Sequence, residues 1–264
     1  MKLSNLRKVT SIFVISMSVM ISNANAALID VAGLVHLWSG EGNATDSVGA
    51  ANGTLGSTTA FAAGYNGQAF SFDGLQSSVS TFPVNIGPSA FPEITLGMYI
   101  NVDRILNNRD WLLGHDNGGY DRALMIFDGR FGTGFASTAG SNSPYSSNLT
   151  NFNLQSNQDK WFGVAVAFNQ STNMATVYIN DLQGSSAVLS QSTNFGEGLS
   201  QFSLGGLMNF GGHTVNALAD EVFIYNRALT QAELDVAFTQ VPEPSTLAIL
   251  ALSMIGLGSR RFKK

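Results

Sequence analysis

The carboxylates of this chain are not spaced for cleavage of a glycosidic bond. Retaining hydrolysis needs an acid and a nucleophile about 5–5.5 Å apart, an arrangement that two carboxylates on one strand face provide. Asp220 and Glu221 are adjacent and should face opposite sides of a strand, while Asp116 and Asp121 fall in a glycine-rich stretch. None of the three histidines has a second histidine at metal-ligand spacing, and the chain has no cysteine. We therefore expect a protein that is not an enzyme.

One segment gathers side chains of the kinds that hold sugars. Aromatic rings pack on the C–H faces of a sugar, and planar polar groups pair with its hydroxyls. Residues 111–130 are rich in both, and a serine- and asparagine-rich stretch follows at 137–157, which should form a loop. The candidate ligand contacts are Asp116, Tyr120, Arg122, Arg130 and Tyr145, with Trp111, His115, Asn117 and Asp121 beside them. Trp111 also fits a core strand, and Trp38 and Trp161 are expected in the core.

Asp220 lies in a run that alternates like a strand. If alternate residues share a face, Leu218, Asp220, Val222 and Ile224 point the same way, and the other three are apolar. Burying a carboxylate without a partner is strongly unfavourable. We therefore expect Asp220 to be buried beside a cation or hydrogen-bond donors, or to have a raised pKa.

The elements that must position these residues are predicted to be β-strands. The central part of the chain is rich in Gly, Asn, Ser, Thr and Phe, and its short alternating runs are separated by turn-forming clusters, which predicts a two-sheet antiparallel β-sandwich. Asp128-Gly129 predicts a hairpin turn, and residues 169–173 predict a hairpin loop. The expected strands are 34–38, 68–72, 78–82, 94–102, 111–114, 123–127, 131–136, 161–168, 174–179, 201–204 and 218–225.

One short helix should follow the last strand. Thr230 and Glu233 have the spacing of a capping box, in which each side chain binds the other residue's backbone N–H. Apolar side chains available to pack this helix against the sandwich are Leu229, Leu234, Val236 and Ala237.

The N-terminal segment predicts export. Lys2, Arg7 and Lys8 precede an apolar stretch at 9–21, and Ala24 and Ala26 form an A-x-A cleavage site. Residues 1–26 are therefore expected to be a signal peptide, with a mature chain that begins at Ala27.

The C-terminal segment, residues 241–264, has three parts in a fixed order. Pro242, Glu243 and Pro244 precede an apolar stretch at 247–257, and four cations follow it. This order resembles the PEP-CTERM sorting signal of Gram-negative bacteria. The resemblance implies an exosortase-type partner, a transient anchor in the inner membrane, and final placement at the cell surface or in the extracellular matrix. The apolar stretch is short for a bilayer core of about 30 Å, so it is a marginal membrane span.

Charge and cysteine content limit the classes of ligand expected for the body, the part of the chain between these two segments. The chain has 13 basic and 18 acidic residues, and after removal of both terminal segments six basic and 17 acidic residues remain, a net charge of about −11. This balance disfavours nucleic acid and favours neutral or cationic ligands and divalent metals. Without cysteine, an exported domain must be stabilised by a large core.

The body resembles LamG-like, concanavalin A-type jelly-roll domains. The resemblance is carried by residues 219–234, by 33–38 with the Gly/Asn-rich stretch 43–54, by 67–74, and by 160–181. It implies a jelly-roll domain over residues 27–240. Two positions depart from the family pattern: Met98-Tyr99 stands where many relatives carry tryptophan, and Phe162-Gly163 where histidine is common.

Relatives of this kind often hold a structural calcium ion between the opening loop and the last strand. The resemblance therefore implies a Ca²⁺ held by Asp220, Asp46 and Asn43, since a hard cation takes six to eight oxygen ligands. The alternative is that Asp220 pairs with backbone amides or Arg227, and that Asp46 shapes a turn.

Together these features predict an exported, non-catalytic protein that binds polysaccharide or another surface glycan. A structural matrix protein without a discrete ligand and a glycoside hydrolase of the same fold are the alternatives.

Overall fold

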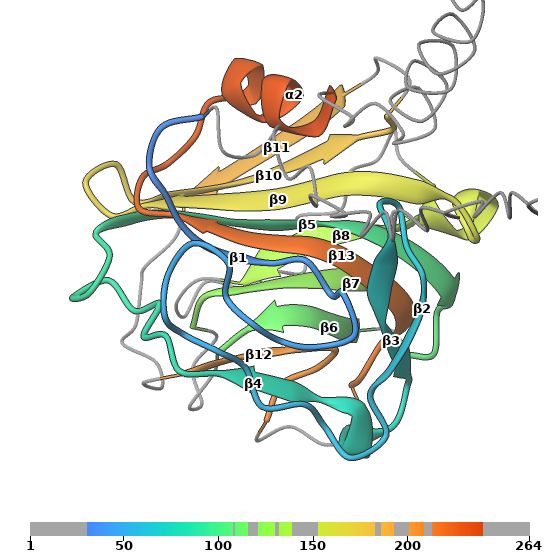
Figure 1. Cartoon of the computed structure of the whole chain (residues 1–264). Helices are drawn as coiled ribbons and strands as arrows, with labels where there is room; N and C mark the ends of the chain where they lie inside the picture. Colours follow the sequence, from blue (N-terminus) through green and yellow to red (C-terminus); the bar gives the residue numbers. More distant parts are fainter. Residues whose placement is uncertain are drawn as a thin grey trace, which may run out of the picture.

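The described part of the chain folds as two stacked antiparallel β-sheets with one α-helix on the outer face of the larger sheet (Figure 1). The structure is a computed structural model and describes residues 31–107, 109–115, 121–129, 132–138, 153–182, 186–192, 201–208 and 213–239. The predicted all-β sandwich with one short C-terminal helix is confirmed.

The larger sheet has the strand order β11-β10-β9-β5-β13-β3-β2, and β1 pairs with β13 outside this path. The central position belongs to the two longest strands, β5 and β13, which pair with each other. The bounds are β1 Leu34–Trp38, β2 Ala60–Ala63, β3 Gln68–Asp73, β5 Glu93–Arg104, β9 Trp161–Asn169, β10 Met174–Asn180, β11 Ser186–Ser192 and β13 Asn216–Tyr225.

The smaller sheet has the order β4-β12-β6-β7-β8. Two short 3-10 helices, Gln76–Ser78 and Leu154–Asn157, precede β4 and β9. The strands are β4 Ser80–Phe82, β6 Arg109–Gly114, β7 Ala123–Gly129, β8 Gly132–Thr138 and β12 Phe202–Leu204.

Alternation along the strands divides the apolar residues between two sides of the larger sheet. Inward residues such as Trp38, Phe70 and Ile100 form the core between the sheets, where the Trp38 ring packs edge-on against Phe82. Outward residues such as Tyr99 and Phe223 form a second cluster with Leu234 and Phe238 of the helix α2, Gln231–Thr239. The helix thus covers part of the outer face of the larger sheet.

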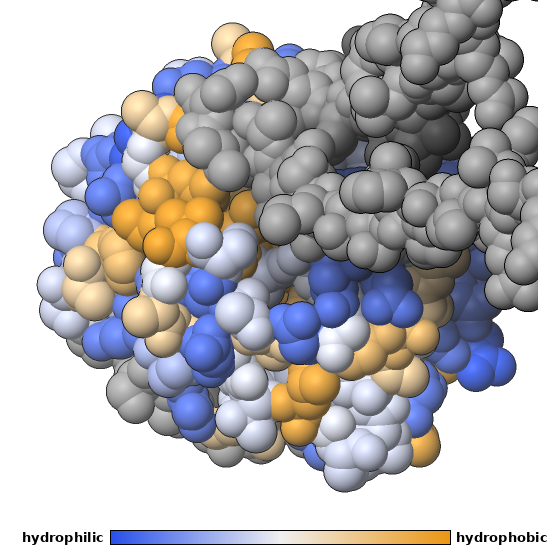
Figure 2. All heavy atoms as spheres, viewed as in Figure 1, coloured by the Kyte–Doolittle hydropathy of each residue, from blue (hydrophilic) through white to orange (hydrophobic). Residues whose placement is uncertain are grey.

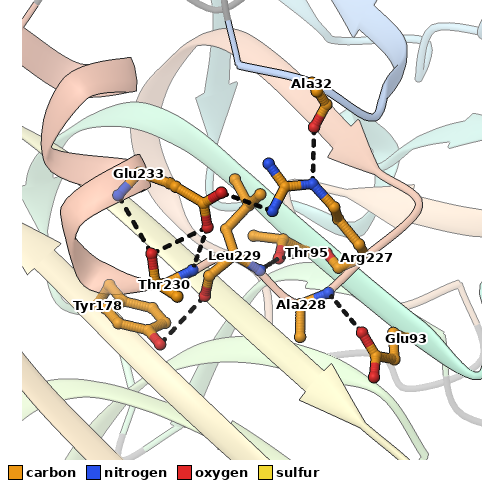
Figure 3. A network of polar contacts seen from close by, with 9 residues as sticks. All are labelled: Ala32, Glu93, Thr95, Tyr178, Arg227, Ala228, Leu229, Thr230 and Glu233. Atoms are coloured by element: carbon orange, nitrogen blue, oxygen red, sulfur yellow. Dashed lines mark hydrogen bonds and ion pairs between the residues drawn. The ribbon is translucent and has the colours of Figure 1, made fainter.

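The capping box predicted for α2 is present. The Thr230 N–H donates to Glu233 Oε2 at 2.8 Å, and the Glu233 N–H donates to Thr230 Oγ1 at 3.4 Å. Arg227 adds an ion pair to Glu233 at 2.7 Å and donates from Nε to the Ala32 carbonyl (Figure 3). Val236 does not pack against the sandwich as predicted: it is 43% exposed, and Phe238 is buried in its place.

All eleven predicted strands are present, and two further strands, β2 and β11, were not predicted. The loop after β9 is confirmed, with β10 beginning at Met174. The hairpin at Asp128-Gly129 is shifted: both residues lie in β7, and Gly129 pairs with Gly132, so the connection is at 130–131.

Candidate functional site

Both carboxylate oxygens of Asp46 take part in hydrogen bonds that shape the loop after β1. Its Oδ2 lies 2.6 Å from His36 Nδ1 and accepts the Ala51 N–H, and its Oδ1 accepts the N–H groups of Leu37 and Gly49. Burial opposes its ionisation, but the hydrogen bonds from His36 and these amides outweigh burial and lower the pKa of Asp46. The alternative role, that Asp46 shapes a turn, describes this arrangement.

Asn43 is also used locally. Its Nδ2 donates to the Glu41 carbonyl at 2.9 Å, and its Oδ1 accepts the Thr45 N–H at 2.8 Å. No three His, Asp or Glu side chains in the described part of the chain are grouped as a metal site. The calcium site of Asp220, Asp46 and Asn43 stays a prediction.

Asp220 is buried as predicted, but on the opposite face of the sheet from Val222. The pairing of β13 with β5 slips between Asp220 and Phe223, and Glu221 takes a left-handed conformation with φ +49°. This bulge places one extra residue in the strand, so Val222 and Ile224 enter the core between the sheets while Asp220 stays on the outer face. The expectation of one common face for 218, 220, 222 and 224 is therefore wrong.

The bulge also turns the carboxyl groups of Asp220 and Glu221 to the same neighbour. The Asn66 N–H donates to Asp220 Oδ2 at 2.9 Å, and Asn66 Nδ2 donates to Glu221 Oε1 at 3.3 Å. The expectation that these two side chains face opposite sides of the strand is thus wrong as well. Gly64, in the same turn between β2 and β3, has no room for a side chain, since a Cβ there would lie 2.6 Å from Asp220 Oδ2.

This acidic pair is buried without full compensation. Asp220 is 0% and Glu221 4% exposed, and among the residues that the structure describes Asp220 Oδ1 and Glu221 Oε2 have no hydrogen-bond partner. Burial raises the pKa of Asp220 to about 7 and the pKa of Glu221 to about 8, and the nearby carboxylates, Glu41 among them, add to both shifts. Arg227, proposed as an alternative partner for Asp220, instead pairs with Glu233.

The predicted sugar contacts that the structure describes are inside the protein. Arg122 is 0% exposed: its Nη1 donates to the carbonyls of Ile86 and Phe91, and its guanidinium lies over the ring of Phe168. These contacts hold Arg122 within the sandwich, so the structure does not support it as a ligand contact. Trp111, His115 and Asp121 are also buried. Asp116, Asn117, Tyr120, Arg130 and Tyr145 lie outside the described residues.

An aromatic hollow lies instead on the outer face of the larger sheet. It has a volume of about 470 Å³, and Tyr65 and Trp161 form its aromatic walls. The centroids of these two rings lie 6.0 Å apart. Tyr65 also stacks on Tyr99, with 4.3 Å between the ring centroids, and this contact fixes the ring of Tyr65 over the sheet. Both rings are partly buried against the cluster under α2, so each keeps an exposed portion.

Polar groups surround these rings. Lys160, Asn157 and Asp181 line the same hollow, and Lys160 Nζ donates to Asn157 Oδ1 at 2.9 Å. The backbone at its edge is strained, because Asp159 and Leu182 both have φ +60°. Strained residues of this kind persist where the fold holds them and tend to cluster at functional sites. The hollow therefore combines aromatic walls, planar polar groups and a fixed backbone.

Little in the amino-acid sequence indicated this site. Tyr65 falls in a short Gly64-Tyr65-Asn66-Gly67 turn. Trp161 was expected in the core but packs, partly buried, against the cluster under α2. The sequence feature that could have indicated the site was Lys160, a charged residue directly before Trp161 at the start of a strand. Figure 2 shows apolar residues gathered in one patch at the upper left of the view and mixed with polar residues over the rest of the described surface that it draws.

The terminal motifs lie outside the described residues. This holds for the cleavage site at Ala24 and Ala26, for Pro242, Glu243 and Pro244, and for the apolar stretch 247–257. Within the described part of the chain, no helix has the length and apolarity needed to cross a bilayer.

Comparison with known proteins agrees with this architecture. The family model of the concanavalin A-like lectin/glucanases superfamily matches residues 73–235, and that of the PEP-CTERM protein-sorting motif matches residues 240–263. No curated protein shows detectable similarity to the chain.

Among solved structures, domain 4 of AbnA, a GH43 extracellular arabinanase from Geobacillus stearothermophilus in complex with arabinotriose, is 21% identical with a TM-score of 0.56. The match covers 77% of this chain and 98% of that one. The receptor binding domain of botulinum neurotoxin type G is 14% identical (TM-score 0.53; 78% of this chain and 51% of that one). A Trypanosoma rangeli sialidase is 19% identical (TM-score 0.53; 79% and 33%). These likenesses concern the fold.

Proposed function

We propose that this chain, which belongs to the concanavalin A-like lectin/glucanases superfamily, is an exported protein that binds polysaccharide without cleaving it. The observation that carries the proposal is the hollow walled by Tyr65 and Trp161. Aromatic faces with nearby amide, carboxylate and ammonium groups match the alternating apolar and hydroxyl surfaces of a sugar ring. The arabinanase domain of the same fold, described in complex with arabinotriose, supports a carbohydrate ligand by analogy.

Two features support a role without catalysis. Glycoside hydrolysis by the common mechanisms uses two carboxyl groups that flank the scissile bond. Among the described residues that line the hollow, Asp181 is the single carboxylate. Asp220 and Glu221 form a close pair, but both are buried beneath the turn between β2 and β3, where a sugar cannot reach them.

The C-terminal motif gives the chain its destination. A PEP-CTERM motif implies export, processing by an exosortase and sorting to the cell envelope. We propose that the signal peptide is removed, that the apolar stretch 247–257 anchors the protein transiently in the inner membrane, and that the released body joins the cell surface or the extracellular matrix of a Gram-negative bacterium. There the hollow would bind cell-surface glycan or matrix polysaccharide.

The test is a glycan array followed by affinity measurement with the mature domain. Trp161→Ala removes one aromatic wall and should weaken binding about tenfold or more, because an aromatic platform contributes on the order of 1.4 kcal/mol or above. Val236→Ala, which removes an exposed apolar side chain from α2, is the matched control and should bind normally. Thermal unfolding of both variants verifies that they fold.

Three results would contradict the proposal. Absence of binding across neutral and acidic glycans would favour a structural matrix protein without a discrete ligand. Turnover of a bound glucan or of the producer's own exopolysaccharide would establish the hydrolase alternative. Equal binding by the wild-type protein and Trp161→Ala would place the sugar elsewhere.

A further inference from the structure

A second, smaller hollow lies on the same face of the larger sheet. It has a volume of about 280 Å³, and its polar lining comes from β3, β5, β13 and the segment before β9. Along β5, Ile100 and Val102 enter the core between the sheets, so Asn101 and Asp103 point outward, to the side that bears Tyr99 and α2. The polar lining residues are Ser71, Asn101, Asp103, Asp159 and Asn216.

The two hollows share a wall. Asp159 lines the second hollow, and the next two residues, Lys160 and Trp161, line the first. Trp161 pairs directly with Asn101 across β9 and β5, and the Asp159 N–H donates to the Val102 carbonyl at 3.0 Å. These bonds hold the shared wall against β5, so the hollows lie side by side on one surface.

A ligand that fills both hollows must be longer than one sugar ring. The lining runs from β9 through β5 and β13 to β3, which is three strand spacings of about 4.8 Å each. The helix covers the neighbouring part of this face, where Tyr99 Oη donates to the carbonyls of Ala237 and Phe238. The uncovered part is thus a strip with an aromatic end and a polar end.

The charges of the strip differ between its ends. The second hollow has two carboxylates, Asp103 and Asp159, and no cation among the described residues that line it. The first hollow has Lys160 together with Asp181. Carboxylates accept hydrogen bonds from sugar hydroxyl or ammonium groups and repel the carboxylate of a uronic acid.

We propose that the two hollows form one groove for several linked units of a neutral or amine-bearing polysaccharide, with one sugar against Trp161 and the following units over Asn101 and Asp103. This inference rests on the proposed carbohydrate binding and adds to it the ligand's polymeric form and its charge class.

Calorimetric titration with three oligosaccharide ladders, each from dimer to hexamer, tests the inference. The probes are cello-oligosaccharides, chitosan oligomers and oligogalacturonides, which are neutral, cationic and anionic. We expect affinity for a neutral or cationic series to rise with length until the groove is filled, and oligogalacturonides to bind at least about tenfold more weakly.

Two variants assign the ends of the groove. Asp103→Asn with Asp159→Asn keeps the shape of the second hollow and removes its charge, and asparagine tolerates the positive φ of residue 159. This double variant should weaken binding of chitosan oligomers about three- to tenfold and strengthen binding of oligogalacturonides. Asp235→Asn, a carboxylate change on α2, is the control and should leave both affinities unchanged.

The outcomes separate this inference from the proposal on which it rests. If binding depends on Trp161 but not on oligomer length, the single groove is wrong and sugar binding stands. If the double variant changes no affinity, or if oligogalacturonides bind best, the assigned charge class is wrong. If none of the probes nor any arrayed glycan binds, both proposals fail.

Discussion

At the scale of single residues, Asp220 and Glu221 make stability depend on pH. Their pKa values are about 7 and about 8 in the folded protein, against 3.8 and 4.5 for unperturbed groups. Between about pH 4 and 8 the folded state therefore holds more protons than the unfolded state, and the free energy of unfolding falls as pH rises through this window. The fold should be most stable at the acidic end.

Glu221→Gln checks this dependence. The amide keeps the acceptor for Asn66 Nδ2 and cannot ionise, so the variant should be more stable than the wild type at pH 9 and should lose stability less steeply between pH 5 and 9. Urea unfolding at a series of pH values, in EDTA, measures both effects. A wild-type curve that stays flat or rises across this range would contradict the assignment.

The calcium expectation depends on the same pair. Of the three predicted ligands, Asp220 alone has an oxygen without a hydrogen-bond partner among the described residues, and Glu221 Oε2 lies in the same cluster. A divalent cation there would compensate both carboxylates, so calcium added to EDTA-treated protein at pH 8 should raise the midpoint of thermal unfolding.

Two variants separate the possible ligands of this ion. Asp220→Asn should abolish the calcium effect. Asp46→Asn should lower the midpoint with or without calcium, because it disturbs the hydrogen bonds to Leu37, Gly49 and Ala51. An unchanged wild-type midpoint on calcium addition would discard the ion.

At the scale of elements, Gly163 allows α2 to lie close to the larger sheet. A Cβ at this position of β9 would lie only 2.4 Å from two ring carbons of Phe238. Gly163→Ala should therefore destabilise the fold by about 1–3 kcal/mol, the usual cost of overpacking.

A double-mutant cycle with Phe238→Leu in urea unfolding isolates this contact. The smaller side chain should recover part of the loss. Additive costs in the double variant would mean that Gly163 matters for another reason. The contact also accounts for the departure at Phe162-Gly163: the larger side chain expected there would occupy the space that Phe238 takes.

Most elements could be predicted, because alternating apolar residues mark strands buried on one face. The strand β2 was not predicted because Ala60–Ala63 is short and rich in alanine, which has a weak strand preference. The site was harder to predict. The bulge at Glu221 places Asp220 on the face opposite to the one predicted. A bulge that contains no glycine has no recognisable pattern in a single sequence. The Tyr65 and Trp161 walls meet only through the packing of β2, β3 and β9, which local patterns do not encode.

At the scale of the whole molecule, the terminal segments predict two cleavages. Mass spectrometry of protein recovered from cells and medium should show a first residue of Ala27 and loss of the residues that follow Pro242-Glu243-Pro244. Replacing Pro242, Glu243 and Pro244 by alanine should leave the basic end attached and the protein in the membrane fraction. Recovery of wild-type protein from the medium with its last residues intact would contradict sorting by an exosortase.

The pairing of β1 with β13 brings the opening and closing segments of the body together, and Val31 shares a cluster with Leu234 and Phe238. The two ends of the body could therefore be joined to each other, and the chain could be opened at another loop. A circular permutant that joins residue 239 to residue 31 through a short flexible linker, and opens the chain in the turn at 170–173, would retain every strand pairing. The same sandwich could then present its new ends at the opposite end of β9, far from its present attachment to the tail, and serve as a display scaffold whose orientation is chosen by the engineer.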